Sequence, residues 1–434
     1  MISSLFLFDL IYFYLINQTD FMKQISKFLS LVFVLCFMQS YAQMYRTVAS
    51  GSWTTLSTWE SSSNGGLSWA AATASPTSAS GTIQILNGHT VTATTVTVDQ
   101  LTIESGGTLS IATGITVTIA NAADAIDCSV LGTISNAGTI TPTGNVTIGN
   151  GGKYVHAASG GPVATCTWAT GSTCEFTGFT SGAMPSNLTQ NYYNLTWNCA
   201  SQTGAANFAG AVATVNGTFN VKNTGTSELR LTGATNLAIS IAGDFIIGGN
   251  TVGGNCNVDI CTGAAASAFV FLKGSLIISA GRLACTNTAN QRFVYFESNL
   301  GNIQDINITT SVVAFPHAFD FAVTTSNGSK VRLLSNVTST GNLECSAGST
   351  LDFQTFVWDG AQLTGKTFYA WSGAHLISAN TSTVGAFNTT GANGSIQLSG
   401  TRTFSGAHFT FNGTAAQKTG SGVTTIGNLT INNV

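Results

Sequence analysis

The chain has 434 residues, of which only 7% are charged, and 14 Lys and Arg against 17 Asp and Glu give a net charge of −3. So few and scattered basic residues provide no basic stripe for nucleic acid. The aromatic content of 10% and the low charge exclude a disordered chain, and the 48 glycines are unlike a typical cytosolic enzyme.

The N-terminus has two apolar runs, residues 5–16 and 28–38. Both are shorter than the ~20 residues that a membrane-spanning helix needs, so we expect no stable membrane span. The second run follows Lys23 and Lys27 and precedes the small-residue stretch 40–42, which is the pattern of a secretory signal peptide. We therefore predict a signal peptide at 22–42, a misassigned upstream extension at 1–21, and a secreted or cell-surface protein.

The first mature segment, 43–125, concentrates tryptophan and glycine. It contains Gly-Ser-Trp at 51–53, Thr-Trp at 58–59, Asn-Gly-His-Thr-Val at 87–91 and Leu-Thr-Ile-Glu-Ser-Gly-Gly-Thr-Leu at 101–109. Over roughly residues 50–120 this order resembles the opening of large secreted surface proteins of gliding and related bacteria, which the type IX secretion system exports. It is also similar to the Gly-rich β module called the G8 domain. The resemblance implies an adhesin-like cell-surface role and names no ligand.

Within this segment, Val96 to Ile119 alternates apolar and polar residues between glycine turns, which is typical of short strands. A phrase of Gly followed by two apolar residues two apart recurs at Gly107, Gly217, Gly243, Gly281, Gly341 and Gly427. We expect these phrases to share one register. Spacings of about 25 residues, without helical periodicity, predict an all-β, right-handed parallel β-helix. β-Sandwich modules are the alternative.

The predicted organisation is a Trp-bearing cap with the first coils at 43–125, followed by solenoid repeats over 126–434. Residues 161–215 are the least regular part, since they contain Pro162, Pro185 and an Ala/Gly-rich stretch. The chain ends inside a repeat phrase, and we therefore expect a protein truncated at its C-terminus.

Eight cysteines follow the signal segment, and an even number in an exported chain permits disulfides. The close pairs Cys166 with Cys174 and Cys256 with Cys261 are the candidates. Cys285 and Cys345 stand at the inward position of the repeat phrase and are interpreted as small buried hydrophobes.

Candidate ligand-binding residues are few. Trp53, Trp59 and Trp69 could stack on sugars or close the first coil as a hydrophobic cap. Asp124 and Asp127 are a candidate calcium pair, although no calcium-loop motif surrounds them. Other charged residues that could act in catalysis occur only in loose pairs, Glu228 with Arg230 and Asp352 with Asp359. The five histidines are far apart in sequence and no nucleophile motif is present, so we predict no catalysis and no cofactor.

These observations favour an exported, non-catalytic adhesive β-solenoid that contacts other surface proteins or extracellular polysaccharide. The alternative is a carbohydrate-active protein that binds or cleaves polysaccharide. A third function, ice binding through Thr-x-Thr arrays such as 95–97 and 116–118, is disfavoured on the expectation that the arrays do not recur at one register.

Overall fold

The structure is a computed structural model that describes residues 21–27, 42–121, 127–232, 237–249, 255–262, 267–286, 292–298, 301–309, 314–315, 320–325, 329–339, 341–360 and 365–433. Residues 21–27 form a helical segment, and the remaining described chain is built from short strands and turns. Among the described residues, no helix has the length and apolar character needed to cross a membrane.

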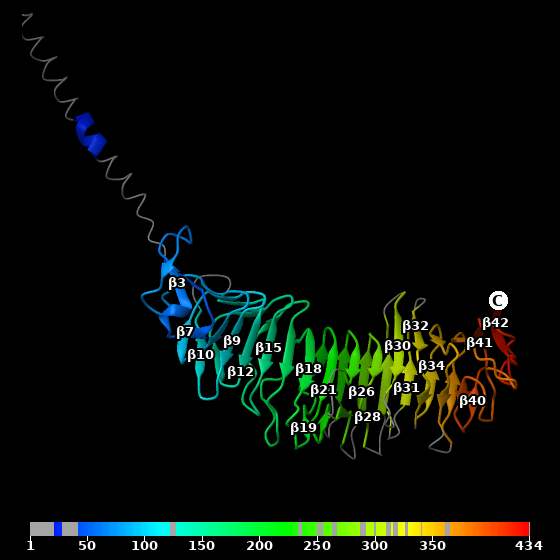
Figure 1. The fold of residues 1–434 in the computed structure, drawn as a ribbon. Coiled ribbons are helices and arrows are strands. Elements are labelled where there is room, and N and C mark those ends of the chain that lie inside the picture. The colour runs from blue at the N-terminus through cyan, green and yellow to red at the C-terminus, as the bar shows by residue number, and fades with distance from the viewer. Residues whose placement is uncertain are drawn as a thin grey trace, which may run out of the picture.

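Within the described residues, one sheet of sixteen strands runs along the solenoid (Figure 1). We call it the long sheet. In spatial order its strands are β2 (Gly51–Ser52), β6 (Thr90–Thr92), β9 (Thr108–Ile111), β12 (Thr133–Asn136), β15 (Lys153–His156), β17 (Thr173–Phe176), β18 (Asn194–Asn198), β21 (Phe219–Asn223), β24 (Phe245–Ile247), β27 (Leu276–Ile278), β30 (Ile303–Ile308), β32 (Lys330–Leu333), β35 (Thr350–Asp352), β38 (His375–Ser378), β41 (Ala407–Phe411) and β42 (Ile426–Ile431).

Two eight-stranded sheets form a second face. The N-terminal side sheet contains β16 (Thr167–Trp168), β14 (Val146–Ile148), β11 (Cys128–Val130), β8 (Leu101–Ile103), β5 (Ile83–Ile85), β1 (Met44–Thr47), β3 (Trp59–Ser62) and β4 (Ala70–Ala71). The C-terminal side sheet contains β20 (Thr214–Val215), β23 (Leu237–Ile241), β26 (Ala268–Leu272), β29 (Arg292–Phe296), β31 (Asp320–Val323), β34 (Leu343–Cys345), β37 (Phe368–Ala370) and β40 (Arg402–Thr403).

Three short sheets form the third face. They are β7 (Val96–Val98), β10 (Thr116–Ile119) and β13 (Thr139–Pro142); then β19 (Ala206–Asn207), β22 (Glu228–Arg230), β25 (Asn257–Asp259) and β28 (Arg282–Ala284); then β33 (Val337–Thr338), β36 (Trp358–Asp359) and β39 (Ile396–Gln397).

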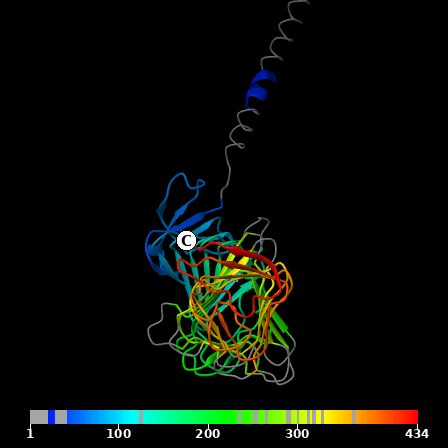
Figure 2. The ribbon, with the colours of Figure 1, turned by 90° about the vertical axis from the view of Figure 1, so that its right-hand side faces the viewer.

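The path of the chain makes the molecule a solenoid. After β21 in the long sheet, the chain passes through β22 on the third face and β23 in the C-terminal side sheet, and it returns to the long sheet as β24, parallel to β21. A complete coil such as this one therefore adds one strand to each face, whereas some coils, such as the one between β17 and β18, add a strand to the long sheet alone. The view along the axis shows the coils superimposed (Figure 2). The predicted parallel β-helix is confirmed, and the alternative of β-sandwich modules is not what the chain forms.

The N-terminal cap is continuous with the solenoid. β3 pairs antiparallel with β1 and β4, whereas β1 pairs parallel with β5 and β2 pairs parallel with β6. A one-turn 3-10 helix, η1 (Leu56–Thr58), links β2 to β3. The cap strands thus extend two of the solenoid sheets and cover the end of the first coil.

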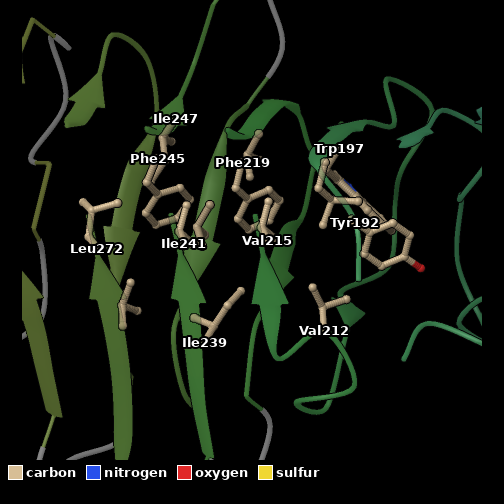
Figure 3. Close-up of a cluster of buried hydrophobic side chains, with 14 of the residues drawn as sticks. Tyr192, Trp197, Val212, Val215, Phe219, Ile239, Ile241, Phe245, Ile247 and Leu272 are labelled. Carbon is tan, nitrogen blue, oxygen red and sulfur yellow. The ribbon is translucent and has the colours of Figure 1, made fainter. Parts of the chain in front are cut away.

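The core is a set of side-chain ladders along the axis. Phe219 and Phe245 occupy paired positions in β21 and β24, and their rings stack with centroids 5.3 Å apart at an interplanar angle of 6° (Figure 3). Both side chains are fully buried, as are Cys345 and, at 1% exposure, Cys285. The interpretation of these two cysteines as small core residues agrees with this burial.

The expectation that all repeat phrases share one register is wrong. The phrases at Gly107, Gly217 and Gly427 lead into strands of the long sheet, but those at Gly281 and Gly341 lead into β28 on the third face and β34 in the C-terminal side sheet. The phrase fits any face, because every strand needs the same inward pair of apolar residues after a turn.

The coil length also varies along the chain. Val91 of β6 pairs with Leu109 of β9 after a short coil, whereas Leu376 of β38 pairs with Phe409 of β41 only after a much longer one. In the irregular part, 161–215, the long sheet continues through β17 and β18, while the other faces carry only two-residue strands. The parallel pairing of strands is therefore regular along the axis, whereas the number of residues per coil is not.

Candidate functional site

The three candidate sugar-stacking tryptophans lie in the cap. Trp53 and Trp59 are 1% exposed, their ring centroids are 5.1 Å apart, and their indole nitrogens donate to Pro76 O and Trp53 O. Neither ring offers a face to a ligand. Trp69 is partly exposed, and the Arg46 guanidinium lies 4.2 Å from its ring centroid. Cap packing therefore accounts for Trp53 and Trp59, and sugar stacking remains a prediction for Trp69 alone.

Of the candidate calcium pair, Asp124 lies outside the described residues. Asp127 is fully buried and its carboxylate accepts the backbone N–H of Asn145 at 2.6 Å. Within the described part of the chain, no three His, Cys, Asp or Glu side chains come together in a way that could hold a metal ion. The calcium prediction is untested by this arrangement.

The candidate disulfide cysteines lie in or beside the core. Cys174 is buried in β17, and Cys166 directly precedes β16 of the same coil, both as thiols. Cys256 and Cys261 flank β25, and the Cys256 thiol donates to Lys222 O at 2.9 Å. Burial raises the pKa of Cys174, so its thiol is a poor nucleophile as it stands. The two disulfides stay predictions.

The threonine arrays are in register, contrary to the expectation from sequence. Thr118 of β10 pairs with Thr97 of β7 and with Thr141 of β13, and Thr116 pairs with Thr139. The backbone N–H of Thr116 also donates to Thr95 Oγ1 at 3.3 Å. The register objection to ice binding is therefore wrong, although the array covers only the three strands of one short sheet.

The most distinctive surface lies on the C-terminal side sheet and was not predicted. Six aromatic side chains there point away from the core, and we call them the aromatic face: Phe269, Phe271, Phe293, Tyr295, Tyr369 and Trp371. The four on β26 and β29 are partly exposed, whereas Tyr369 and Trp371 are 42% and 47% exposed. Large aromatic side chains gathered on one outward face are characteristic of a binding surface.

Strand register places four of these rings in one cluster. Phe269 pairs with Phe293 and Phe271 pairs with Tyr295 across β26 and β29. The Phe271 and Tyr295 rings stack with centroids 5.1 Å apart, and the Phe293 and Tyr295 centroids are 5.2 Å apart. Cross-strand aromatic pairs of this kind stabilise a sheet, and the cluster is formed by the protein's own strand pairing.

The second part of the aromatic face is held by a carboxylate. Trp371 follows β37, and its ring centroid is 4.9 Å from that of Tyr369 in a T-shaped arrangement. The Trp371 indole N–H donates to the Glu344 carboxylate, and Glu344 pairs directly with Tyr369 across β34 and β37. This hydrogen bond fixes the orientation of an otherwise exposed indole.

Carboxylates surround the tyrosine at the centre of the surface. Burial raises the pKa of the Tyr295 phenol, and the carboxylates of Glu344, Glu297 and Asp320 raise it further. Asp320 is oriented by the backbone N–H of Asn342, which donates to its Oδ1 at 2.7 Å. Burial also raises the pKa of Glu297, which the neighbouring Lys273 opposes. Aromatic rings and hydrogen-bond acceptors thus share one face.

The sequence carried a signal for this surface. β26 reads Ala-Phe-Val-Phe-Leu and β29 reads Arg-Phe-Val-Tyr-Phe, so apolar residues fill both faces of strands that elsewhere alternate Thr or Ser with apolar residues. Since one face of each strand packs on the core, the second apolar row must point outward. The run Phe-Tyr-Ala-Trp at 368–371 carries the same signal, but only the coil register brings Tyr369 and Trp371 alongside the other rings.

The structure also pairs two histidines that the sequence keeps apart. His375 of β38 and His408 of β41 face each other across the long sheet, and His375 Nε2 lies 2.8 Å from Thr410 Oγ1. Burial lowers the pKa of His375, and His408 lowers it further. The register thus places two titratable rings side by side on the long sheet.

Comparison with family models, with curated proteins and with solved structures gives no match for this chain.

Proposed function

We propose that this protein is an exported, cell-surface adhesive β-solenoid that binds extracellular polysaccharide through the aromatic face and performs no catalysis. The observation that carries the proposal is the outward cluster of Tyr295 and Trp371 with the carboxylate of Glu344 between them. Aromatic rings stack on the apolar faces of sugar rings, and carboxylates accept hydrogen bonds from sugar hydroxyls.

Export is supported by the signal-like segment at 22–42 and by the resemblance of residues 50–120 to secreted bacterial surface proteins. A solenoid suits an adhesive role, because each coil contacts only its neighbours and the stack forms a stiff, extended surface. The type IX route and a G8-type cap belong to the same proposal.

The alternative is an enzyme that cleaves polysaccharide, and the observation in its favour is the gathering of Glu297, Asp320 and Glu344 around Tyr295. Incubation of the purified chain with neutral and uronate polymers, followed by analysis of chain length, separates the two functions. We expect retention on immobilised polysaccharide without shortening of the polymer. Turnover that Glu344→Gln abolishes would replace the adhesive function with the enzymatic one.

A further inference from the structure

Building on the proposed polysaccharide binding, we propose that the aromatic face takes an uncharged linear glycan that lies along the solenoid axis, with about one sugar for each coil, and that it rejects uronate polymers. The proposal concerns the class and direction of the ligand, which the proposed function leaves open. It rests on strand register, on the spacing of parallel strands and on the charges beside the rings.

The direction follows from the register. A single outward column of the C-terminal side sheet contains Phe271, Tyr295, Ala322, Glu344 and Tyr369, one residue from each of five consecutive strands. Trp371 stands beside the last of them. The rings and the acceptor are therefore aligned across the strands, which is the direction of the solenoid axis (Figure 1).

The spacing follows from the sheet. Neighbouring strands lie about 4.8 Å apart, so the column from β26 to β37 spans about 19 Å. This strand spacing is close to the length that one pyranose unit adds to an extended polysaccharide chain. A linear glycan laid on the column thus meets one outward position on each coil, and its sugar rings meet aromatic side chains at both ends.

The charges select against anionic glycans. β31, β34 and β37 contain Asp320 and Glu344 and no Lys or Arg. Lys273, beside Glu297, and Arg292, at the start of β29, lie at the β26–β29 end of the surface. Uronate carboxylates placed over Asp320 and Glu344 would lose hydration and face like charges, whereas sugar hydroxyls would donate to both.

The test uses the full chain in isothermal titration with two hexasaccharides, cellohexaose as the neutral probe and hexagalacturonate as the anionic probe. We expect cellohexaose to bind and hexagalacturonate not to bind. Tyr295→Ala and Trp371→Ala should each weaken binding about tenfold or more, because each removes one stacking surface. Trp69→Ala tests the rival location, because Trp69 is the partly exposed sugar-stacking candidate of the cap. The control is Leu67→Ala, which removes an 89% exposed apolar side chain from the cap and should leave binding unchanged.

Two further measurements address direction and charge. Affinity should rise with chain length from trimer to pentamer and then level off, because five strands form the column. The double variant Asp320→Asn, Glu344→Gln should gain affinity for hexagalacturonate, while its far-ultraviolet circular dichroism stays that of the native protein.

The outcomes separate the two proposals. Binding of hexagalacturonate that depends on Trp371 overturns the charge selection and leaves polysaccharide binding intact. If Trp69→Ala loses affinity for the glycan and Trp371→Ala does not, the glycan binds at the cap and not at the aromatic face. If the folded protein binds no glycan, both proposals are overturned. If light scattering shows a dimer that Trp371→Ala dissociates, both are overturned as well, because the aromatic face is then an interface between two copies.

Discussion

Tyr295 and Glu344 stand two strands apart in one column of the C-terminal side sheet, and the small side chain of Ala322 lies between them. Ala322 is only 2% exposed although its position faces outward, so its larger neighbours cover it. The carboxylate of Glu344 is close enough to the phenol to raise the pKa of Tyr295. The small residue at the middle position thus leaves room for the larger side chains on either side of it to approach each other.

The first prediction concerns this electrostatic contact. Glu344→Gln removes a negative charge that disfavours the phenolate, so the pKa of Tyr295 should fall. The change should be small, because water screens the partly exposed pair. Ultraviolet difference titration of the variant against a Tyr295→Phe background isolates this tyrosine among the nine in the chain. An unchanged titration curve would show that the two groups do not interact.

How much of this surface the sequence could predict depends on the residue. The outward rows of Phe269 and Phe271 follow from strand periodicity, because two apolar rows on one strand cannot both face one core. The neighbourhood of Tyr295 and Trp371 does not follow, since coils of unequal length hide which distant positions pair. Short alternating strands between glycine turns were enough to predict the parallel β-helix. The unequal coil lengths hid which face each repeat phrase belongs to, so the register of the phrases was predicted wrongly.

The same limit applies to the cap and the threonine array. The Trp-rich segment could be identified as a cap from its place before the repeats, but its merging with two sheets required the pairing of β1 with β5 and of β2 with β6. The in-register array of Thr97, Thr118 and Thr141 was missed because the first two are closer in sequence than the last two. Because the coils differ in length, residues that pair across neighbouring strands are not evenly spaced in the sequence.

The second prediction distinguishes core aromatics from surface aromatics. Phe245→Ala should destabilise the solenoid by about 3–5 kcal/mol, because the ring is fully buried and stacked on Phe219. Phe271→Ala removes a partly exposed ring of the same size and should cost clearly less. Urea unfolding monitored with hydrogen exchange of β24 and β26 measures both. Equal destabilisation by the two variants would contradict the assignment of Phe271 to a binding surface.

The third prediction concerns the approach of neighbouring coils. Gly217, Gly243 and Gly274 stack at one corner, where a Cβ on Gly274 would lie 2.2 Å from the carbonyl carbon of Gly243. Gly274→Ala must push the two coils apart and should cost about 1–3 kcal/mol in unfolding free energy. The control is Gly88→Asn, at a turn with φ +79° and open space, which asparagine tolerates. If Gly274→Ala left the unfolding free energy unchanged, the coils at this corner would be less tightly packed than the glycine contacts indicate.

The last prediction is a loss of stability in mild acid. Burial, His408 and Lys330 lower the pKa of His375, with Asp352 opposing them, and burial lowers the pKa of His156. A histidine with a lowered pKa binds fewer protons in the folded state than in the unfolded state, so stability falls as the pH drops below the unfolded value of about 6.5. The midpoint of thermal unfolding should therefore be lower at pH 5 than at pH 7.5.

His375→Gln tests how much of this loss belongs to the histidine pair. Glutamine keeps a partner for Thr410 Oγ1, which lies 2.8 Å from His375 Nε2, but it carries no titrating group beside His408. The drop in melting temperature between pH 7.5 and pH 5 should shrink by about 2 °C or less, because water partly screens the pair and the chain is large. His156, which is buried and whose Nε2 lies 2.9 Å from Gly160 O, contributes to the remaining loss. If the melting temperature of the variant fell by as much between pH 7.5 and pH 5 as that of the parent protein, the histidine pair would not contribute to the loss of stability in acid.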